Sequence, residues 1–148
     1  MESEKKTLDL SALATTDEGD LHILFPDGTK TGWTWTFAGP SHPKTIEINN
    51  KQSARYIARE QAKERAVTNG RKWKGDEETA EEVFARSVDY ITDRLLRWSD
   101  LEVDGAPFHC TPENARKVLS DRKYGLVLDQ VNAFLGEEKS FTKRSPKV

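Results

Sequence analysis

The side chains of this chain that could support nucleophilic or metal chemistry are few: His22, His42, His109 and Cys110 among 148 residues. His109 and Cys110 are adjacent, but neighbouring residues rarely face the same metal ion, and no other histidine or cysteine lies near them in the sequence. A cysteine nucleophile needs a base and a supporting local signature, and the sequence around Cys110 has no such signature. We therefore expect no metal and no cofactor. We interpret Cys110 as a small, half-buried residue at the start of a helix.

The 25 acidic side chains could supply paired carboxylates for acid-base catalysis, but no pair stands out. Five of them crowd into residues 76–82, where a helix N-terminus explains them because its dipole favours negative charge. A calcium loop would need alternating oxygen ligands and a central glycine, and this run has neither. The sequence also contains no phosphate-binding, dinucleotide-binding, zinc-protease or serine-hydrolase motif. We therefore predict that the protein is not an enzyme.

A basic stripe occupies residues 51–74, where eight lysines and arginines outnumber two glutamates and Trp73 lies among the last cations. An aromatic ring among cations can stack on a base while the cations contact phosphates. However, the whole chain has a net charge of -2, and residues 75–104 carry ten acidic side chains against three arginines. Nucleic-acid binding is therefore the less favoured interpretation. Such charged blocks attract one another within a fold, or they dock a partner.

A β-hairpin is predicted at residues 21–37. The run GWTWTF at 32–37 alternates, so that its aromatic residues share one face and its threonines the other, as a half-buried strand requires. PDG at 26–28 supplies turn residues between this run and the preceding apolar run LHILF. We expect the alternation to bury Trp33 and Trp35 against the helices.

A polar helix is predicted from about residue 43 to residue 69, with Gly70 as its C-terminal stop. Its apolar face is thin and consists mainly of alanines and isoleucines. A helix of this kind is either exposed to solvent or covered by a partner.

The best helical pattern lies at residues 80–98, where Thr79 and Glu82 form a capping box. Apolar side chains recur there at steps of three and four residues, which predicts one continuous core helix. The members of this stripe are Phe84, Val88, Ile91, Leu95 and Trp98. We expect Phe84, Trp98 and Phe134 to lie in the core.

The remaining elements are shorter. A short extended pair is expected around the turn dipeptide Asp104-Gly105. Thr111 and Pro112 open a short helix at 112–119, and an apolar helix at 124–135 ends at Gly136. A hairpin followed by helices, with one short β excursion, places the chain in the α+β class.

We expect a single α+β domain at residues 21–136. Residues 1–20 form an acidic, loosely ordered arm that can dock through its leucines, and residues 137–148 form a basic tail. Hydrophobic residues make up 35% and charged residues 32% of the chain, so the core is expected to be small and the surface heavily charged.

A single cysteine rules out an internal disulfide and fits a reducing compartment. No apolar run approaches the ~20 residues of a membrane span, and the first residues lack the apolar segment of a signal peptide. We therefore expect a cytoplasmic protein without membrane contact.

Several segments together resemble a family of small phage proteins. They are GWTWTFAGPSHP at 32–43, LRWS at 96–99, VDGAPF at 103–108, TPENA at 111–115 and a closing helix ending near Phe141. In this order they are similar to proteins encoded among the tail genes of long-tailed bacteriophages, which are described as tail assembly chaperones or minor tail-module proteins. The resemblance covers most of the chain from residue 32 onward.

The resemblance implies a non-enzymatic chaperone that binds the phage tape measure protein, keeps it soluble and helps the tail tube protein polymerise around it. It implies a location in the host cytoplasm. The residues that we expect to contact a partner lie on the basic helix and its connector: Tyr56, Ile57, Arg59, Lys63 and Trp73.

Two alternatives remain. The first is a structural component of the virion, a tail or head accessory protein that self-associates through its hairpin and charged blocks. The second is a small nucleic-acid-binding regulator.

Overall fold

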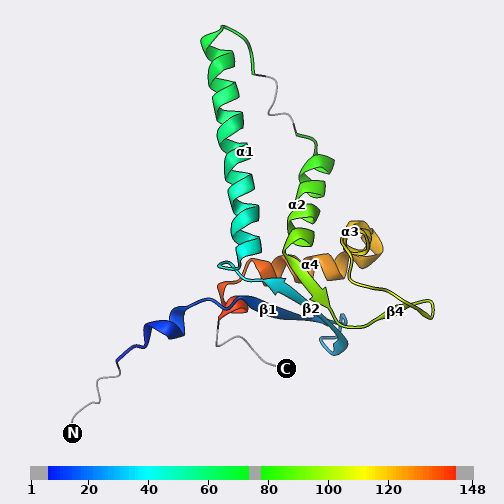
Figure 1. Ribbon diagram of the computed structural model, residues 1–148. Coiled ribbons are helices and arrows are strands. Elements are labelled where there is room, and N and C mark those ends of the chain that lie inside the picture. Colours follow the sequence, from blue (N-terminus) through cyan, green and yellow to red (C-terminus); the bar gives the residue numbers. More distant parts are fainter. Residues whose placement is uncertain (1–6, 74–77, 143–148) are drawn as a thin grey trace.

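The computed structural model describes residues 7–73 and 78–142 and has the predicted α+β class (Figure 1). Residues 1–6 of the predicted arm, 74–77 of the connector and 143–148 of the basic tail lie outside the described residues. The strands are β1 (Glu18–Leu24), β2 (Lys30–Ala38), β3 (Leu95–Trp98), β4 (Glu102–Val103) and β5 (Ala106–Pro107). The helices are α1 (Pro43–Thr68), α2 (Ala80–Arg94), α3 (Pro112–Ser120) and α4 (Gly125–Leu135). Three 3-10 turns lie at Leu10–Leu13, Arg122–Tyr124 and Glu138–Phe141.

The predicted hairpin is confirmed, because β1 and β2 pair in antiparallel fashion around the turn that contains Gly28. Gly28 has a φ of 88°, a conformation that glycine adopts without steric cost. The pairing extends beyond the predicted limits and matches Glu18 with Ala38. Residues 18–20, which we assigned to the loosely ordered arm, therefore belong to the sheet. The leucines of that arm, Leu8, Leu10 and Leu13, remain exposed instead of docking.

The predicted helix at 80–98 is wrong at its C-terminal end. Thr79 caps it as expected, because its hydroxyl accepts a hydrogen bond from the backbone N–H of Glu82 at 3.1 Å. The helix, however, ends at Arg94, and the chain turns to an extended conformation at Leu95. The next four residues form β3, which pairs with β2 and completes a three-stranded sheet in the order β1-β2-β3.

A β-bulge explains why the sequence resembled a longer helix. Along β3, Leu95 pairs with Phe37 and Trp98 pairs with Trp35, and the register shifts between these pairs because β3 holds one extra residue. In a regular strand, residues three apart would face opposite sides. The bulge brings Leu95 and Trp98 to the same buried side, so a helical spacing continues into a strand.

The core lies between the sheet, the C-terminal half of α2, α3 and α4. Trp35 and Phe37 are fully buried, and the ring centroids of Trp33, Trp35 and Trp98 lie 5.0 to 5.3 Å apart. The expected burial of the hairpin tryptophans is confirmed for Trp35, while Trp33 is half-buried against the same cluster. Phe134 also packs on the core. Phe84 does not, because it lies further from the sheet on α2 and is 42% exposed.

Arg94 ties several elements together at the end of the sheet. Its guanidinium, only 5% exposed, donates hydrogen bonds to the carbonyl oxygen of Ala38 from Nη2 at 2.6 Å and from Nε at 3.1 Å. A third bond runs from Nη1 to the Tyr90 hydroxyl at 3.2 Å. The Thr45 hydroxyl donates to the same Ala38 carbonyl at 3.4 Å. One carbonyl at the end of β2 is therefore bonded by both α1 and α2.

The residues that lead into β1 meet the C-terminal end of the described chain. The backbone N–H of Thr16 donates to the carbonyl oxygen of Phe141 at 2.8 Å, and Thr15 forms a β-bridge with Thr142. The Phe141 side chain is 2% exposed, and its ring lies 5.2 Å from the guanidinium carbon of Arg94. The beginning of the predicted basic tail is therefore part of the core.

α1 and α2 form an antiparallel helical arm that projects from this body (Figure 1). α1 has 26 residues, which corresponds to a length of about 39 Å. His42 caps its N-terminus, where Nδ1 accepts a hydrogen bond from the N–H of Lys44 at 3.0 Å. At its C-terminus Gly70 has a φ of 71° and the N–H of Arg71 bonds the carbonyl of Ala66, so the predicted stop is confirmed.

Trp98→Ala should lower the free energy of unfolding by about 3 to 5 kcal/mol, because it removes a buried aromatic ring from the centre of the cluster. Urea denaturation measures the change. Arg97→Ala is the matched control on the same strand, because its side chain is exposed and pairs with Glu18 at the surface, an interaction worth under ~1 kcal/mol. Equal effects of the two substitutions would contradict the core assignment of Trp98.

Gly19→Ala should destabilise the fold by about 1 to 3 kcal/mol, because a Cβ there would lie 2.7 Å from the Phe141 ring and from the carbonyl oxygen of Ser140. Gly125→Ala is the control, since a Cβ at Gly125 meets nothing within 4 Å and alanine favours the helix. Thermal unfolding of both variants tests the contact between β1 and Phe141; a Gly19→Ala variant as stable as the parent would show that Phe141 is not held there.

Candidate partner-binding site

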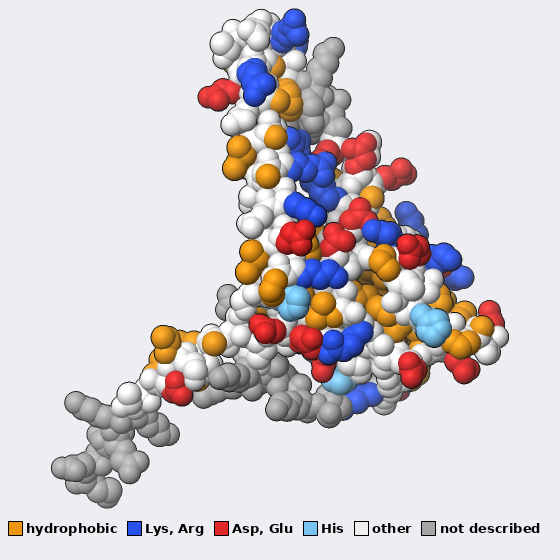
Figure 2. Space-filling model, viewed as in Figure 1, with side chains coloured by type: hydrophobic (Ala, Val, Ile, Leu, Met, Phe, Trp, Pro, Cys, Tyr) orange, Lys and Arg blue, Asp and Glu red, His pale blue; other side chains and the backbone are white. Residues whose placement is uncertain are grey.

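α1 exposes large apolar side chains along the part that projects from the body. Of its described residues, Thr45 alone is buried. Figure 2 shows apolar side chains along the arm, well above the body. The large ones on α1 are Ile46, 47% exposed, Tyr56, 66%, Ile57, 55%, and Val67, 65%.

Two different surfaces of α1 follow from the helical repeat. Ile46 and Ile57 are eleven residues apart, which is three turns, so they lie on one side of the helix. Arg55 lies nine residues from Ile46, half a turn out of phase, and therefore on the other side. We call the side that carries Ile46, Ala54 and Ile57 the outer face.

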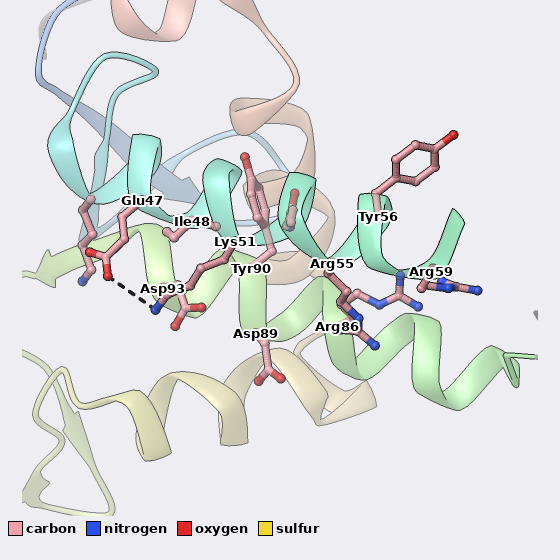
Figure 3. A pocket seen from close by; sticks show the side chains of 12 residues that line it. Glu47, Ile48, Lys51, Arg55, Tyr56, Arg59, Arg86, Asp89, Tyr90 and Asp93 are labelled. Atoms are coloured by element: carbon pink, nitrogen blue, oxygen red, sulfur yellow. Dashed lines mark ion pairs between the residues drawn. The ribbon is translucent and has the colours of Figure 1, made fainter. Parts of the chain in front are cut away.

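The opposite side of α1 forms a groove with α2 (Figure 3). The groove has a volume of about 580 Å³ and is lined by charged and aromatic side chains from both helices. α1 contributes Lys51, Arg55 and Arg59, and α2 contributes Arg86, Tyr90 and Asp93. Tyr56 lies at the rim, and its ring points away from α2.

A carboxylate joins the two helices at the distal part of the groove. Glu78 lies just before α2 and forms ion pairs with Arg59, at 3.3 Å, and with Arg86. The Glu78 side chain is 20% exposed and that of Arg59 is 33% exposed, so this pair is less accessible to water than the ion pair between Lys51 and Glu47. Glu78 therefore contributes to the position of α2 against α1.

The structure separates the residues predicted to contact a partner. Tyr56 and Arg59 line the groove, and Ile57 lies on the outer face. Lys63 is exposed one turn beyond Arg59. Trp73 follows α1 and is half-buried, and its indole N–H is buried with no hydrogen-bond partner among the described residues.

Sequence reasoning missed the contribution of α2 to this site. Arg86 was hidden within an acidic segment, and Glu78 was interpreted only as part of a helix N-terminus. The sequence did indicate the α1 side of the groove, because Lys51, Arg55 and Arg59 recur every four residues and therefore follow one side of a helix.

The residues considered for catalysis or metal binding are not among those that line the groove. Cys110 is half-buried at the start of α3, and burial raises the pKa of its thiol, which keeps it protonated near neutral pH. Within residues 7–73 and 78–142, no three His, Cys, Asp or Glu side chains gather in a group that could hold a metal ion. Over the same residues, no helix has the length and apolar character needed to cross a membrane.

Comparisons of the chain with protein-family models, with curated proteins and with solved structures give no match.

Ile57→Gln should change the free energy of unfolding by less than about 0.5 kcal/mol, because the side chain is already exposed and glutamine is a good helix former. Ile91→Gln on α2 is the contrasting variant, since Ile91 is 2% exposed and a buried polar amide there should cost several kcal/mol. Urea denaturation of both variants gives the comparison. A loss of 2 kcal/mol or more in Ile57→Gln would show that the outer face already has a partner within the fold.

Proposed function

We propose that this protein is a non-enzymatic assembly factor that binds a helical segment of another protein along α1. The observation that carries the proposal is the exposure of α1, a 26-residue helix that projects from the body with one buried residue among those described. Such a helix gains little stability from packing against the rest of the protein. Ile46 and Ile57 are 47% and 55% exposed, so complete coverage by a partner would contribute about 1 kcal/mol from each side chain.

The arrangement suits recognition of a helix. The outer face presents Ile46, Ala54 and Ile57 at helical spacing, and an amphipathic partner helix can pack its own apolar side chains between them. The body anchors the base of α1 through the Ala38 carbonyl, and the ion pairs of Glu78 hold α2 beside it. A surface fixed in this way loses less conformational entropy on binding than a flexible segment would lose.

The resemblance of the sequence to phage tail assembly chaperones supports a more specific form of the proposal. In that form the partner is the tape measure protein of a long-tailed phage, and the chain keeps it soluble in the host cytoplasm while the tail tube assembles. A long helical client fits a long helical binding surface. We expect the chain to act as a protein-binding surface without chemical turnover.

Co-expression of this chain with the tape measure protein of the same phage tests the proposal. The soluble fraction of the tape measure protein should rise several-fold with the intact chain, and it should fall with the double variant Ile46→Gln, Ile57→Gln. Leu126→Gln is the matched control, because Leu126 is an equally apolar, 43% exposed residue on α4. If the intact chain leaves the tape measure protein insoluble, the chaperone assignment fails.

The alternative as a structural virion component makes the opposite prediction for purified particles. A chaperone should be missing from finished virions, whereas a tail or head accessory protein should be present at a stoichiometric level. Quantitative mass spectrometry of purified particles separates the two assignments.

A further inference from the structure

The distal half of the α1-α2 groove concentrates positive charge. Arg55 and Arg59 lie one turn apart on α1, and Arg86 faces them from α2 (Figure 3). We call these three residues the arginine cluster. All three line the same groove, and Arg59 and Arg86 contact the same carboxylate, although like charges repel. Such a cluster is held together where carboxylates lie between the guanidinium groups.

Among the described residues, Glu78 places a carboxylate of the protein itself within the arginine cluster. Glu78 bonds Arg59 through Oε1 and Arg86 through Oε2, so its two oxygens are divided between the two helices. Its geometry shows that the groove can accept a carboxylate bridging α1 and α2. Glu78 lies immediately after residues 74–77, in the connector between the helices, and not within either helix.

Glu78 pairs with Arg59 and Arg86 but not with Arg55. Over the described residues, the Arg55 guanidinium has no ion pair or hydrogen bond, and the side chain is exposed in the groove. The nearest turn towards the body holds Lys51, whose charge is matched by Glu47 at 3.4 Å. The arginine cluster therefore has room for further negative charge beside Arg55, about 6 Å along the helix from Arg59.

We propose that the arginine cluster binds an acidic helical segment of a partner protein, with one carboxylate of that segment on Arg55 and another replacing Glu78 between Arg59 and Arg86. Carboxylates four residues apart on a partner helix have the same spacing as Arg55 and Arg59. The inference rests on the proposed protein-binding role, and it adds a second contact surface, on the side of α1 opposite the outer face, and the chemistry of the segment that binds there.

The groove favours a peptide over a nucleic acid. Towards the body, α2 contributes Asp89 and Asp93 to the same groove. These carboxylates would repel a continuous chain of phosphates, whereas a protein segment needs only a short acidic stretch and can place neutral or basic residues opposite them. The Asp89 carboxylate is already bonded to Arg116 of α3 at 3.0 Å and stays in place.

The test measures binding of a fluorescein-labelled, alanine-rich helical peptide with two glutamates four residues apart to the full chain, by fluorescence anisotropy at low ionic strength. The same peptide with glutamines is the comparison ligand, and it should bind at least about 10-fold more weakly. Arg55→Gln should weaken binding of the glutamate peptide about 5- to 10-fold. Arg122→Gln, the same charge change at an exposed residue away from the groove, should leave binding unchanged.

Glu78→Gln gives the decisive result, because it removes a carboxylate of the protein that occupies the place proposed for the peptide carboxylate. The variant should bind the glutamate peptide about 3- to 10-fold more tightly than the parent chain does, although its fold has lost two ion pairs. A purely structural role of Glu78 predicts equal or weaker binding. If Glu78→Gln and Arg55→Gln both leave the peptide affinity unchanged, the proposal is overturned.

Two further outcomes are distinguishable. If a mixed-sequence DNA oligomer binds as tightly as the glutamate peptide and Arg55→Gln weakens both equally, the cluster is a general polyanion site and the peptide assignment is wrong. If the peptide behaves as expected while the chain fails to solubilise the tape measure protein, the proposed chaperone function fails and the acidic-segment site stands. If the chain solubilises the tape measure protein but the peptide does not bind as expected, only the acidic-segment site is overturned.

Discussion

Arg94 places a positive charge at the junction of the body and the arm with 5% of its surface exposed. Over the described residues, the guanidinium is bonded to the Ala38 carbonyl and the Tyr90 hydroxyl and contacts the ring of Phe141, without a carboxylate. Burying a cation costs several kcal/mol unless polar groups replace its water, and the carboxyl end of α2 adds a favourable dipole. The end of β2, the last turn of α2 and Phe141 must therefore stay together. The position of the arm depends on this requirement.

Local chemistry was sufficient to predict most element boundaries. The alternation of tryptophan and threonine indicated β2, and Thr111 with Pro112 marked the start of α3, where the Thr111 hydroxyl accepts from the N–H of Asn114 at 3.1 Å. Gly70 ended α1 through backbone hydrogen bonds that involve only neighbouring residues. These features form within a few residues of chain, so the sequence contains all the information needed for them.

Features that depend on distant residues were not predictable. Leu95 and Trp98 have spacing that suits a helix, but they form a strand because this segment pairs with the edge of β2. Phe84 shares the period of the core residues but lies too far along α2 to reach the sheet. In the candidate site, the spacing of Arg55 and Arg59 indicated a common face, whereas the positions of Arg86 and Glu78 depend on how α2 folds back along α1.

The pairing of Thr16 with Phe141 has a consequence for how the protein acquires its fold during synthesis. Phe141 leaves the ribosome after nearly all of the other described residues, yet Gly19 and Arg94 pack against it. The helices of the arm can form early because their hydrogen bonds are local, whereas contacts between distant residues form slowly and only once both partners exist. Until then, the hairpin retains an uncovered apolar surface, and nascent chains are vulnerable to association with one another during this interval.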